Sequence, residues 1–496
     1  MKKVIKSFPS IVSLTLLIQL LGLIRSVFLS NDLGATIELD AFYLANILTI
    51  SVFSVVSSSI STVMIPSLIS EKKNKSKKSS TEYLIAILVL AILFSTLLFL
   101  FLLIFINFIN PNFNNQLKFD FLLMVISLLF SQLFRILSTY FMSMLQIRSK
   151  YFLSRLPNII PSAFPLMYIF LSKDFYLLHF VYILSVSYFF EMTFYILISN
   201  IKFPQKFNLN LKLDDHTIQM LKNTVPILAG SAVFQVQIIV INYFAGFFGS
   251  GFITILSNTN QIVGIFQGLL VANIFTLVYP QMVSEIKNNL NVGLKRTEIY
   301  IGFTNVIVIF LVWGYAAVGK DLVSFLFYRG NFSLQSTNSV YIFGLILMIG
   351  LPFSVIRDYI YRVYYALDNT SKPTKNAILT VILNIFLLVT LSFFIDEYSL
   401  VISTSIGTII SLYNIIKQAR KDKLFFNWRK VTLLFIYLNV LAFLMFSGII
   451  IWGIDSENNL LNLITNTSIG IIIFLLILGI HYILYRKNFF KNFYHF

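Results

Sequence analysis

The chain of 496 residues has no cysteine, only four histidines, and charged side chains at only 11% of its positions. Without cysteine it cannot form disulfides, thiolate nucleophiles, zinc–thiolate sites or iron–sulfur clusters. The histidines, at 179, 216, 481 and 495, lack metal-ligand spacing, so we expect no metal site and no cofactor. The scarcity of charge excludes a water-soluble enzyme, since soluble domains carry charge at about a quarter of their positions.

Long hydrophobic runs are abundant. A helix needs about 20 mostly apolar residues to cross the bilayer, and fourteen such runs alternate with clusters of charged and turn-forming residues. They lie at residues 9–30, 38–69, 83–107, 119–147, 153–172, 175–199, 217–246, 252–284, 298–319, 337–366, 375–395, 398–416, 431–452 and 463–485. The sequence therefore predicts an all-α polytopic membrane protein with about fourteen transmembrane helices.

The net charge of +17 follows a topological pattern. If the N-terminus is cytoplasmic, 29 of the 37 Lys and Arg residues lie in cytoplasmic segments and only four lie in opposite-side connections. Cytoplasmic loops of multi-pass proteins carry this excess. We predict a multi-pass membrane protein with both termini cytoplasmic, and no nucleic-acid partner.

Four arginines remain, and they fall within predicted spans: Arg25, Arg135, Arg357 and Arg362. A charge inside the membrane is costly, so such side chains usually face a bundle interior or a watery cavity. Arg25 has an acidic neighbour in Asp40, at the start of the second span, and the two either form an ion pair or act in substrate contact and gating. For Arg135, a structural role in the helix bundle and a functional role in the cavity are both open.

Acidic residues within the spans are equally informative. Glu191 lies deep in the sixth span, where it either binds a coupling ion or proton or has a structural role. Arg357 and Asp358 are adjacent and point about 100° apart on a helix, so we do not expect them to pair with each other. The i,i+4 spacing predicts a pair between Asp358 and Arg362, which leaves Arg357 as the freer cation.

A pattern of the form T-x3-P-x3-S-E occurs twice, at residues 62–71 and 276–285. Six predicted spans separate the copies, which indicates two parallel six-helix repeats. We predict an N-terminal six-helix lobe at residues 1–200, a second lobe at 201–421, and two additional C-terminal helices at 422–496.

Several motifs resemble the MurJ-type lipid II flippases of the multidrug/oligosaccharidyl-lipid/polysaccharide exporter superfamily. They are Leu21-Gly22-Leu-Ile-Arg25, Leu33-Gly34-Ala35, Leu39-Asp40-Ala41-Phe42, Leu326-Phe-Tyr-Arg329-Gly330-Asn-Phe332-Ser333, and Tyr365-Ala366-Leu367-Asp-Asn-Thr370-Ser-Lys-Pro373. The resemblance implies a V-shaped pair of lobes around a cationic cavity, with the last two helices shaping a groove for a polyprenyl tail.

The activity implied by the resemblance is not enzymatic. It is translocation of a polyprenyl-pyrophosphate-linked saccharide, such as lipid II, from the inner to the outer leaflet by alternating access. The partners implied are that lipid-linked oligosaccharide and membrane lipids; we expect a monomer, alone or with cell-envelope synthesis proteins. The alternatives are a flippase for capsule, O-antigen or teichoic-acid units, a cation-coupled multidrug exporter, a membrane-embedded transferase, and a non-transporting scaffold.

The sequence departs from the family where the resemblance places cavity arginines. Gln19, Thr49, Ile50 and Gln261 stand at those positions, and Arg25 is the cavity arginine that is kept. We expect Gln19 and Gln261 to contact substrate beside Arg25, with replacement charge from Arg135, Arg357 or Arg362. The family's sodium site is matched in part by Asn384, but residues 377–394 contain no acid, so the membrane potential is the alternative driver.

Overall fold

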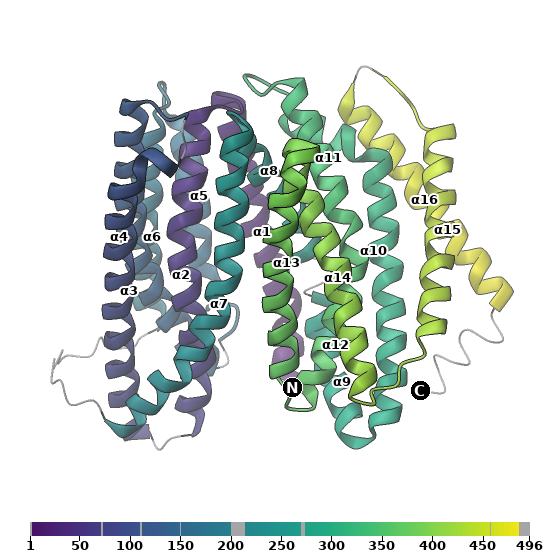
Figure 1. The fold of residues 1–496 in the computed structure, drawn as a ribbon, viewed down its shortest axis with the longest axis horizontal. Coiled ribbons are helices and arrows are strands. Elements are labelled where there is room, and N and C mark those ends of the chain that lie inside the picture. Colours follow the sequence, from purple (N-terminus) through teal and green to yellow (C-terminus); the bar gives the residue numbers. More distant parts are fainter. Residues whose placement is uncertain are drawn as a thin grey trace. The chain divides into compact units, whose positions relative to one another are not determined.

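The computed structural model describes residues 2–70, 73–109, 112–148, 150–199, 214–268, 273–456 and 458–485, and these ranges contain helices but no strand. Contacts between helices divide the chain into two compact units, Met1–Gln261 and Ile262–Phe496. The prediction of an all-α protein is therefore confirmed. Figure 1 shows the helices in sequence colours.

The first unit is formed by long helices that pack side by side. Helices α2, α4 and α6 contact one another, and α7 lies along α2 and α3. A side-chain cap begins α4, where Asn114 accepts a 2.7 Å hydrogen bond from the amide of Leu117. The elements are α1 (Lys2–Leu33), α2 (Ile37–Ser70), α3 (Lys73–Ile109), α4 (Asn115–Ile147), the 3-10 helix η1 (Leu156–Ile159), α5 (Ile160–Leu171), α6 (Leu177–Ser199), α7 (Asp215–Phe248) and most of α8 (Phe252–Phe266).

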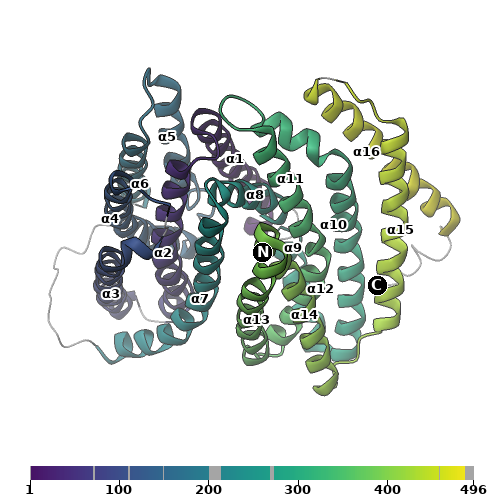
Figure 2. The ribbon, with the colours of Figure 1, turned by 45° about the horizontal axis from the view of Figure 1, so that its top comes forward.

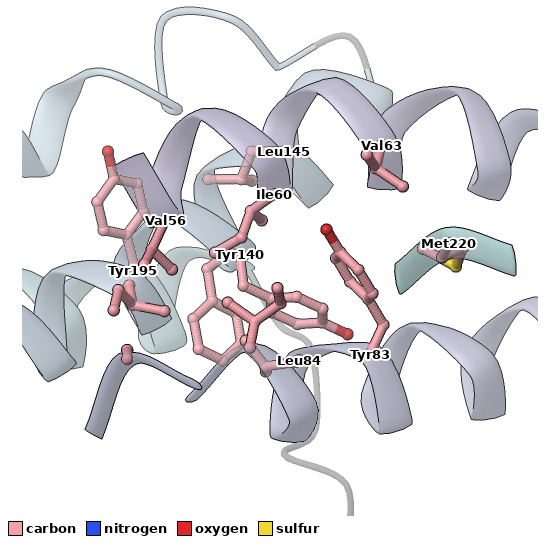
Figure 3. Packing of buried hydrophobic residues seen from close by; sticks show 13 residues of the cluster. Val56, Ile60, Val63, Tyr83, Leu84, Tyr140, Leu145, Tyr195 and Met220 are labelled. Atoms are coloured by element: carbon pink, nitrogen blue, oxygen red, sulfur yellow. The ribbon is translucent and has the colours of Figure 1, made fainter. Parts of the chain in front are cut away.

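The core of this unit lies where α2, α3, α4 and α6 meet. Figure 3 shows aliphatic side chains of α2, including Val56 and Ile60, beside the rings of Tyr83, Tyr140 and Tyr195. The buried Tyr83 hydroxyl lies 2.7 Å from the Thr224 hydroxyl of α7. A buried hydroxyl needs such a partner, so tyrosine can fill this core while its polar end is satisfied.

The second unit continues the helical pattern. Its elements are α9 (Asn273–Asn288), α10 (Leu290–Phe327), α11 (Leu334–Ile349), α12 (Leu351–Ala366), α13 (Ser371–Ile395), η3 (Asp396–Tyr398), α14 (Ser399–Lys421), α15 (Trp428–Trp452) and α16 (Asn459–Tyr485). Figures 1 and 2 both show α15 alongside α10, and α10 contacts both α15 and α16. The indole of Trp313 donates to Asn439 Oδ1 at 3.1 Å, which fixes α10 to α15 within an otherwise apolar contact.

A polar cluster surrounds Asp422 at the end of α14. Its carboxylate accepts hydrogen bonds from the Tyr364 hydroxyl (2.7 Å) and Gln418 Nε2 (3.0 Å), and Lys372 Nζ lies 3.7 Å away. Burial alone would raise the pKa of Asp422, but the hydrogen bonds from Gln418 and Tyr364 and the Lys372 charge together lower it. The carboxylate therefore ties the ends of α12 and α14 together in its ionised form.

The protein is a multi-pass membrane protein. Eleven helical segments of the described chain are long and apolar enough to span a membrane. The fourteen predicted runs lie mostly on helix, although 153–172 begins in a turn before η1 and α5. Run 252–284 comprises α8 and α9, with residues 269–272 outside the described residues, and run 337–366 is broken between α11 and α12. Gly350 followed by Pro352 accounts for this break, because proline lacks the amide that would continue the helix. The count of fourteen stays a prediction.

The predicted lobe boundaries, at 200 and 421, also stay predictions. By contacts, the first unit extends to Gln261, because α7 packs against α2 and α3 and because the start of α8 is bonded to α2. In the first copy of the repeated pattern, Glu71 and the side chains of Thr62, Pro66 and Ser70 lie outside the described residues.

Candidate substrate site and buried charges

One face of α8 carries three polar residues, Thr254, Asn258 and Gln261. Their spacing of four and three places them in one row along the helix. We call this row the α8 polar stripe. Each member contacts a polar group of α1 or α2 within the first unit, so the stripe connects three helices that carry the sequence-predicted residues.

Asp40 binds the first member of the stripe. One of its carboxylate oxygens accepts from the Thr254 amide and hydroxyl, both at 2.7 Å, and the other accepts from the Gly251 amide at 2.6 Å. Asp40 is 0% exposed. Amides in the first turn of a helix have no partner within it, so the carboxylate of α2 completes the start of α8.

The contacts of Asp40 decide whether it pairs with Arg25. Both oxygens of Asp40 accept hydrogen bonds from α8 and its preceding loop, and no ion pair joins Asp40 to Arg25 in the described residues. Gly251 allows the close approach: its φ is +92°, and a side-chain carbon there would collide with the backbone of Ala35. The interpretation of Asp40 as the partner of Arg25 is wrong for this structure.

The second member, Asn258, is fully buried and bridges α1 and α2. Its Nδ2 donates to Ser30 Oγ of α1 at 2.8 Å, and its Oδ1 accepts from the Tyr43 hydroxyl of α2 at 3.4 Å. A buried amide with both ends engaged fixes the rotation of α8 about its own axis. It thereby determines which way Gln261, one turn further along, points.

The third member, Gln261, meets the other predicted glutamine. Gln261 Nε2 lies 3.5 Å from the backbone oxygen of Gln19, and Gly22 gives it room, since a side-chain carbon at Gly22 would be 3.1 Å from that nitrogen. Gln19 Oε1 is enclosed and accepts no hydrogen bond within the described residues. The structure thus brings together two predicted site residues and leaves one amide oxygen able to accept a hydrogen bond.

Arg25 lies on α1 between the levels of Gln19 and Ser30. It is half-buried, and it forms no hydrogen bond or ion pair with the part of the chain that the structure describes. The Arg25 guanidinium interacts electrostatically with the buried Tyr43 of α2. A guanidinium without an acidic partner keeps its planar donors available for phosphate oxygens.

Arg135 and Glu191 lie on adjacent helices, α4 and α6. The Arg135 guanidinium sits over the ring of Phe53 (4.0 Å to the centroid) and the ring of Tyr188 (4.7 Å), and it donates to Gln132 Oε1 at 3.1 Å. Glu191 is 7% exposed, and its Oε2 has no hydrogen-bond partner among the described residues. The two side chains interact electrostatically without an ion pair.

The prediction for α12 is wrong in two respects. Arg357 pairs with its neighbour, with Nη2 and Nε at 2.9 and 3.0 Å from Asp358 Oδ1. Arg362 instead donates to the backbone oxygen of Asp358 at 3.1 Å and lies over the Phe275 ring at 3.5 Å. The long arginine side chain can reach back across the 100° between neighbours, and an aromatic face is available to hold Arg362.

Asn384 is the residue that the resemblance places in part of a sodium site. Asn384 of α13 is buried against Gly407 of α14. Within the described ranges, no group of three His, Asp or Glu residues could hold a metal ion.

Sequence reasoning missed several residues of the site: Ser30, Tyr43, Gly251, Thr254 and Asn258. The spacing of Thr254, Asn258 and Gln261 along one row of a predicted membrane helix was the available signal, because polar residues in such a row face other polar groups. Their partners on α1 and α2 are more than 200 positions away, so no local pattern identifies them.

Comparison with known proteins supplies the family context. The family model described as lipid II flippase MurJ matches residues 29–474. A probable lipid II flippase MurJ of Vibrio cholerae serotype O1 is 21% identical over 233 residues, which cover 47% of this chain and 44% of that protein. The alignment therefore spans less than half of the relative's length.

Solved structures show the same fold. The structure of a lipid II flippase MurJ in an inward closed conformation has a TM-score of 0.83 at 21% identity, covering 96% of this chain and 99% of the other. An inward-facing multidrug resistance MATE family transporter of the MOP superfamily has a TM-score of 0.59 at 10% identity, covering 86% and 98%. The architecture is thus common to transporters of this superfamily.

Proposed function

Because the chain belongs to the MurJ lipid II flippase family, we propose that it is a flippase for lipid II or a related polyprenyl-pyrophosphate-linked cell-envelope precursor. It moves this lipid from the inner to the outer leaflet of the bacterial cytoplasmic membrane by alternating access, without catalysing a reaction. The single observation that supports this proposal is the family match over residues 29–474. Both termini lie in the cytoplasm, and the chain acts as a monomer.

The physical problem that such a protein solves is the headgroup. A pyrophosphate and its sugars cannot cross about 30 Å of hydrocarbon, whereas the polyprenyl tail can remain in the lipid. In our proposal, Arg25 contacts the phosphate groups, since it has no acidic partner in the described residues. Gln19 and Gln261 contact sugar hydroxyls or amides, for which an unpaired amide oxygen is an acceptor.

The charges of α12 have a second role in this proposal. Arg357 is paired with Asp358, so it contributes little net charge, whereas Arg362 is held by a ring and a backbone oxygen and keeps its charge. We assign Arg362 rather than Arg357 to phosphate contact in the second unit. Asp40 orients α8 and thereby positions Gln261.

The glutamines also support a second candidate substrate. Gln19 and Gln261 are neutral, and they stand where the resemblance places arginines. Amides in place of guanidinium groups hydrogen-bond sugar hydroxyls and amides rather than pair with phosphate, so they suit a different glycan on the same polyprenyl carrier, such as a capsule, O-antigen or teichoic-acid unit. The same alternating movement would serve it, so only the substrate differs.

The test is rescue of a bacterial strain depleted of its essential lipid II flippase. We expect the wild-type chain to restore growth and Arg25→Ala to fail at equal membrane levels. The matched control is Arg329→Ala, which removes the same side chain from an exposed position between α10 and α11. It should rescue like the wild type.

Each outcome decides between the candidates. If the wild type fails to rescue despite normal expression, lipid II is not the substrate, and reconstituted vesicles should then be tested with a teichoic-acid or capsule precursor. If Arg25→Ala rescues fully, the assignment of Arg25 to phosphate contact is wrong while the flippase function stands. Failure of all precursors in vesicles would overturn the proposal in favour of a non-transporting role.

A further inference from the structure

We infer that Glu191 is a proton-binding site in the first unit and that Arg135 is the counter-charge that receives the carboxylate when the proton leaves. The inference goes beyond the proposed function and does not depend on which lipid is carried. It is based on three observations: an enclosed carboxyl group, a neighbouring cation held elsewhere, and a polar route leading from the carboxyl group.

The carboxyl group comes first. Glu191 is 7% exposed within the membrane-spanning helix α6, and its Oε2 has no hydrogen-bond partner among the described residues. An ionised carboxylate in apolar surroundings requires a cation or several donors, and otherwise it takes up a proton. In our proposal, Glu191 carries a proton in the observed arrangement.

The neighbouring cation, Arg135, already has other interaction partners. Arg135 is held by the faces of Phe53 and Tyr188 and by Gln132 Oε1, and it forms no ion pair with Glu191 in the described part of the chain. The Arg135 side chain is nevertheless close enough to interact electrostatically with Glu191. When the proton leaves, the ionised carboxylate attracts the Arg135 guanidinium away from the rings of Phe53 and Tyr188.

This movement connects the proton to the packing of three helices. Phe53 belongs to α2, Arg135 to α4, and Tyr188 and Glu191 to α6. Withdrawal of the guanidinium removes a contact that α2 makes with α4. By linkage, any rearrangement that separates α2 from α4 and α6 changes the affinity of Glu191 for its proton.

A polar route leads from Glu191 along α6. Tyr195 lies one turn further on and is 1% exposed, and its hydroxyl lies 2.7 Å from the Ser154 backbone oxygen and 2.6 Å from Asn158 Oδ1. Ser154 and Asn158 lie at the end of the unit that the charge pattern assigns to the cytoplasm. In our proposal, the proton exchanges with the cytoplasmic side past Tyr195.

The other groups around Glu191 leave it as the site of protonation. The elements packed against α6 are α4, α5, η1 and α2. Their titratable or charged members in the described residues near this level are Arg135 and Tyr140 of α4 and Arg155 beside η1, while α6 itself contributes Tyr188 and Tyr195. Arg155 acts electrostatically on Tyr195. α2 contributes Phe53 at this level, and Tyr168 of α5 is engaged with Tyr176.

The experiment is infrared difference spectroscopy of the purified full chain in vesicles of phosphatidylethanolamine and phosphatidylglycerol, titrated from acidic to alkaline pH. A protonated carboxyl group gives a carbonyl band that disappears on ionisation. We expect a band at neutral pH that is missing in Glu191→Gln and retained in Glu38→Gln, which removes an exposed carboxylate of α2. In Arg135→Gln the band should persist to a pH higher by at least about one unit, since an opposite charge nearby favours ionisation by this amount or more.

Two results would overturn the inference. One is the absence of any Glu191-dependent band at every pH, which would mean that the carboxylate is permanently ionised. The other is an unchanged midpoint in Arg135→Gln, which would remove Arg135 as the counter-charge. If Glu191→Gln does not fold, Glu191→Asp takes its place and should move the band rather than abolish it. The assay contains no lipid-linked saccharide, so its failure leaves the proposed function untouched.

Discussion

Replacement of Asp40 by alanine tests whether the carboxylate of α2 holds the start of α8. The change removes three hydrogen bonds and leaves the buried amides of Gly251 and Thr254 without their acceptor. Each buried amide left unsatisfied costs about 1–3 kcal/mol. In bilayers the measured contribution of a side-chain hydrogen bond averages only about 0.6 kcal/mol, because the unfolded state also finds partners. For the three bonds together we expect a loss of about 3 kcal/mol in the free energy of unfolding.

The assay is equilibrium unfolding in mixed micelles, followed by the loss of helical circular dichroism. The matched control is Glu38→Ala, which removes an exposed carboxylate half a turn earlier on the same helix and should change stability by less than about 0.5 kcal/mol. Asp40→Asn keeps one acceptor oxygen and should lose about 1 kcal/mol. If Asp40→Ala is as stable as Glu38→Ala, the carboxylate does not stabilise the start of α8 and our account of the polar stripe is wrong.

Three further predictions follow from other contacts. Gly251→Ala should destabilise the protein by at least about 2 kcal/mol in the same unfolding assay, because the positive φ of Gly251 and the nearby backbone exclude a side chain. The control, Gly264→Ala, adds a carbon with no atom within 4 Å and should leave the stability unchanged. An equal loss of stability in both variants would refute the argument. Asp422→Asn should lower the melting temperature at pH 7, and its difference from the wild type should shrink as pH falls below about 3.9, because a lowered folded pKa stabilises the fold above the unfolded value and this stabilisation is lost as pH falls through the folded pKa; a difference that stays constant across the acidic range would contradict this. A double-mutant cycle of Arg362→Met and Phe275→Leu should give a coupling of about 1 kcal/mol, and a coupling near zero would show that the ring does not hold the cation.

The architecture was largely predictable from the sequence because the bilayer simplifies the problem. Backbone groups in hydrocarbon must be satisfied within the chain, so every long apolar run has to be helical. The fourteen runs lie mostly on helix, including 9–30 within α1 and 463–485 within α16. The break at Gly350 was not predicted, since hydropathy continues across this residue while the helix does not.

The sequence correctly predicted which charged residues lie within the spans, but it did not predict their interaction partners. Their scarcity made Arg25, Arg135 and Glu191 stand out, since each is costly in a membrane. Partner choice, however, depends on side-chain reach: Arg357 bends back to Asp358, and Arg362 turns to an aromatic ring. Helical spacing describes where side chains start, whereas a long side chain can end several ångströms away.

By itself the sequence therefore determined that this is an all-helical membrane protein, which charged residues lie within its spans, and which family's motifs it resembles, because composition and helical spacing are local properties. The tertiary structure decided that Asp40 accepts hydrogen bonds from α8 rather than pairing with Arg25, and that Gln261 contacts Gln19. It also decided that Glu191 Oε2 has no hydrogen-bond partner among the described residues. These contacts join residues separated by up to 242 positions, or depend on how tightly neighbouring helices enclose a side chain. Only packing brings such groups together, and no periodicity in the chain encodes it.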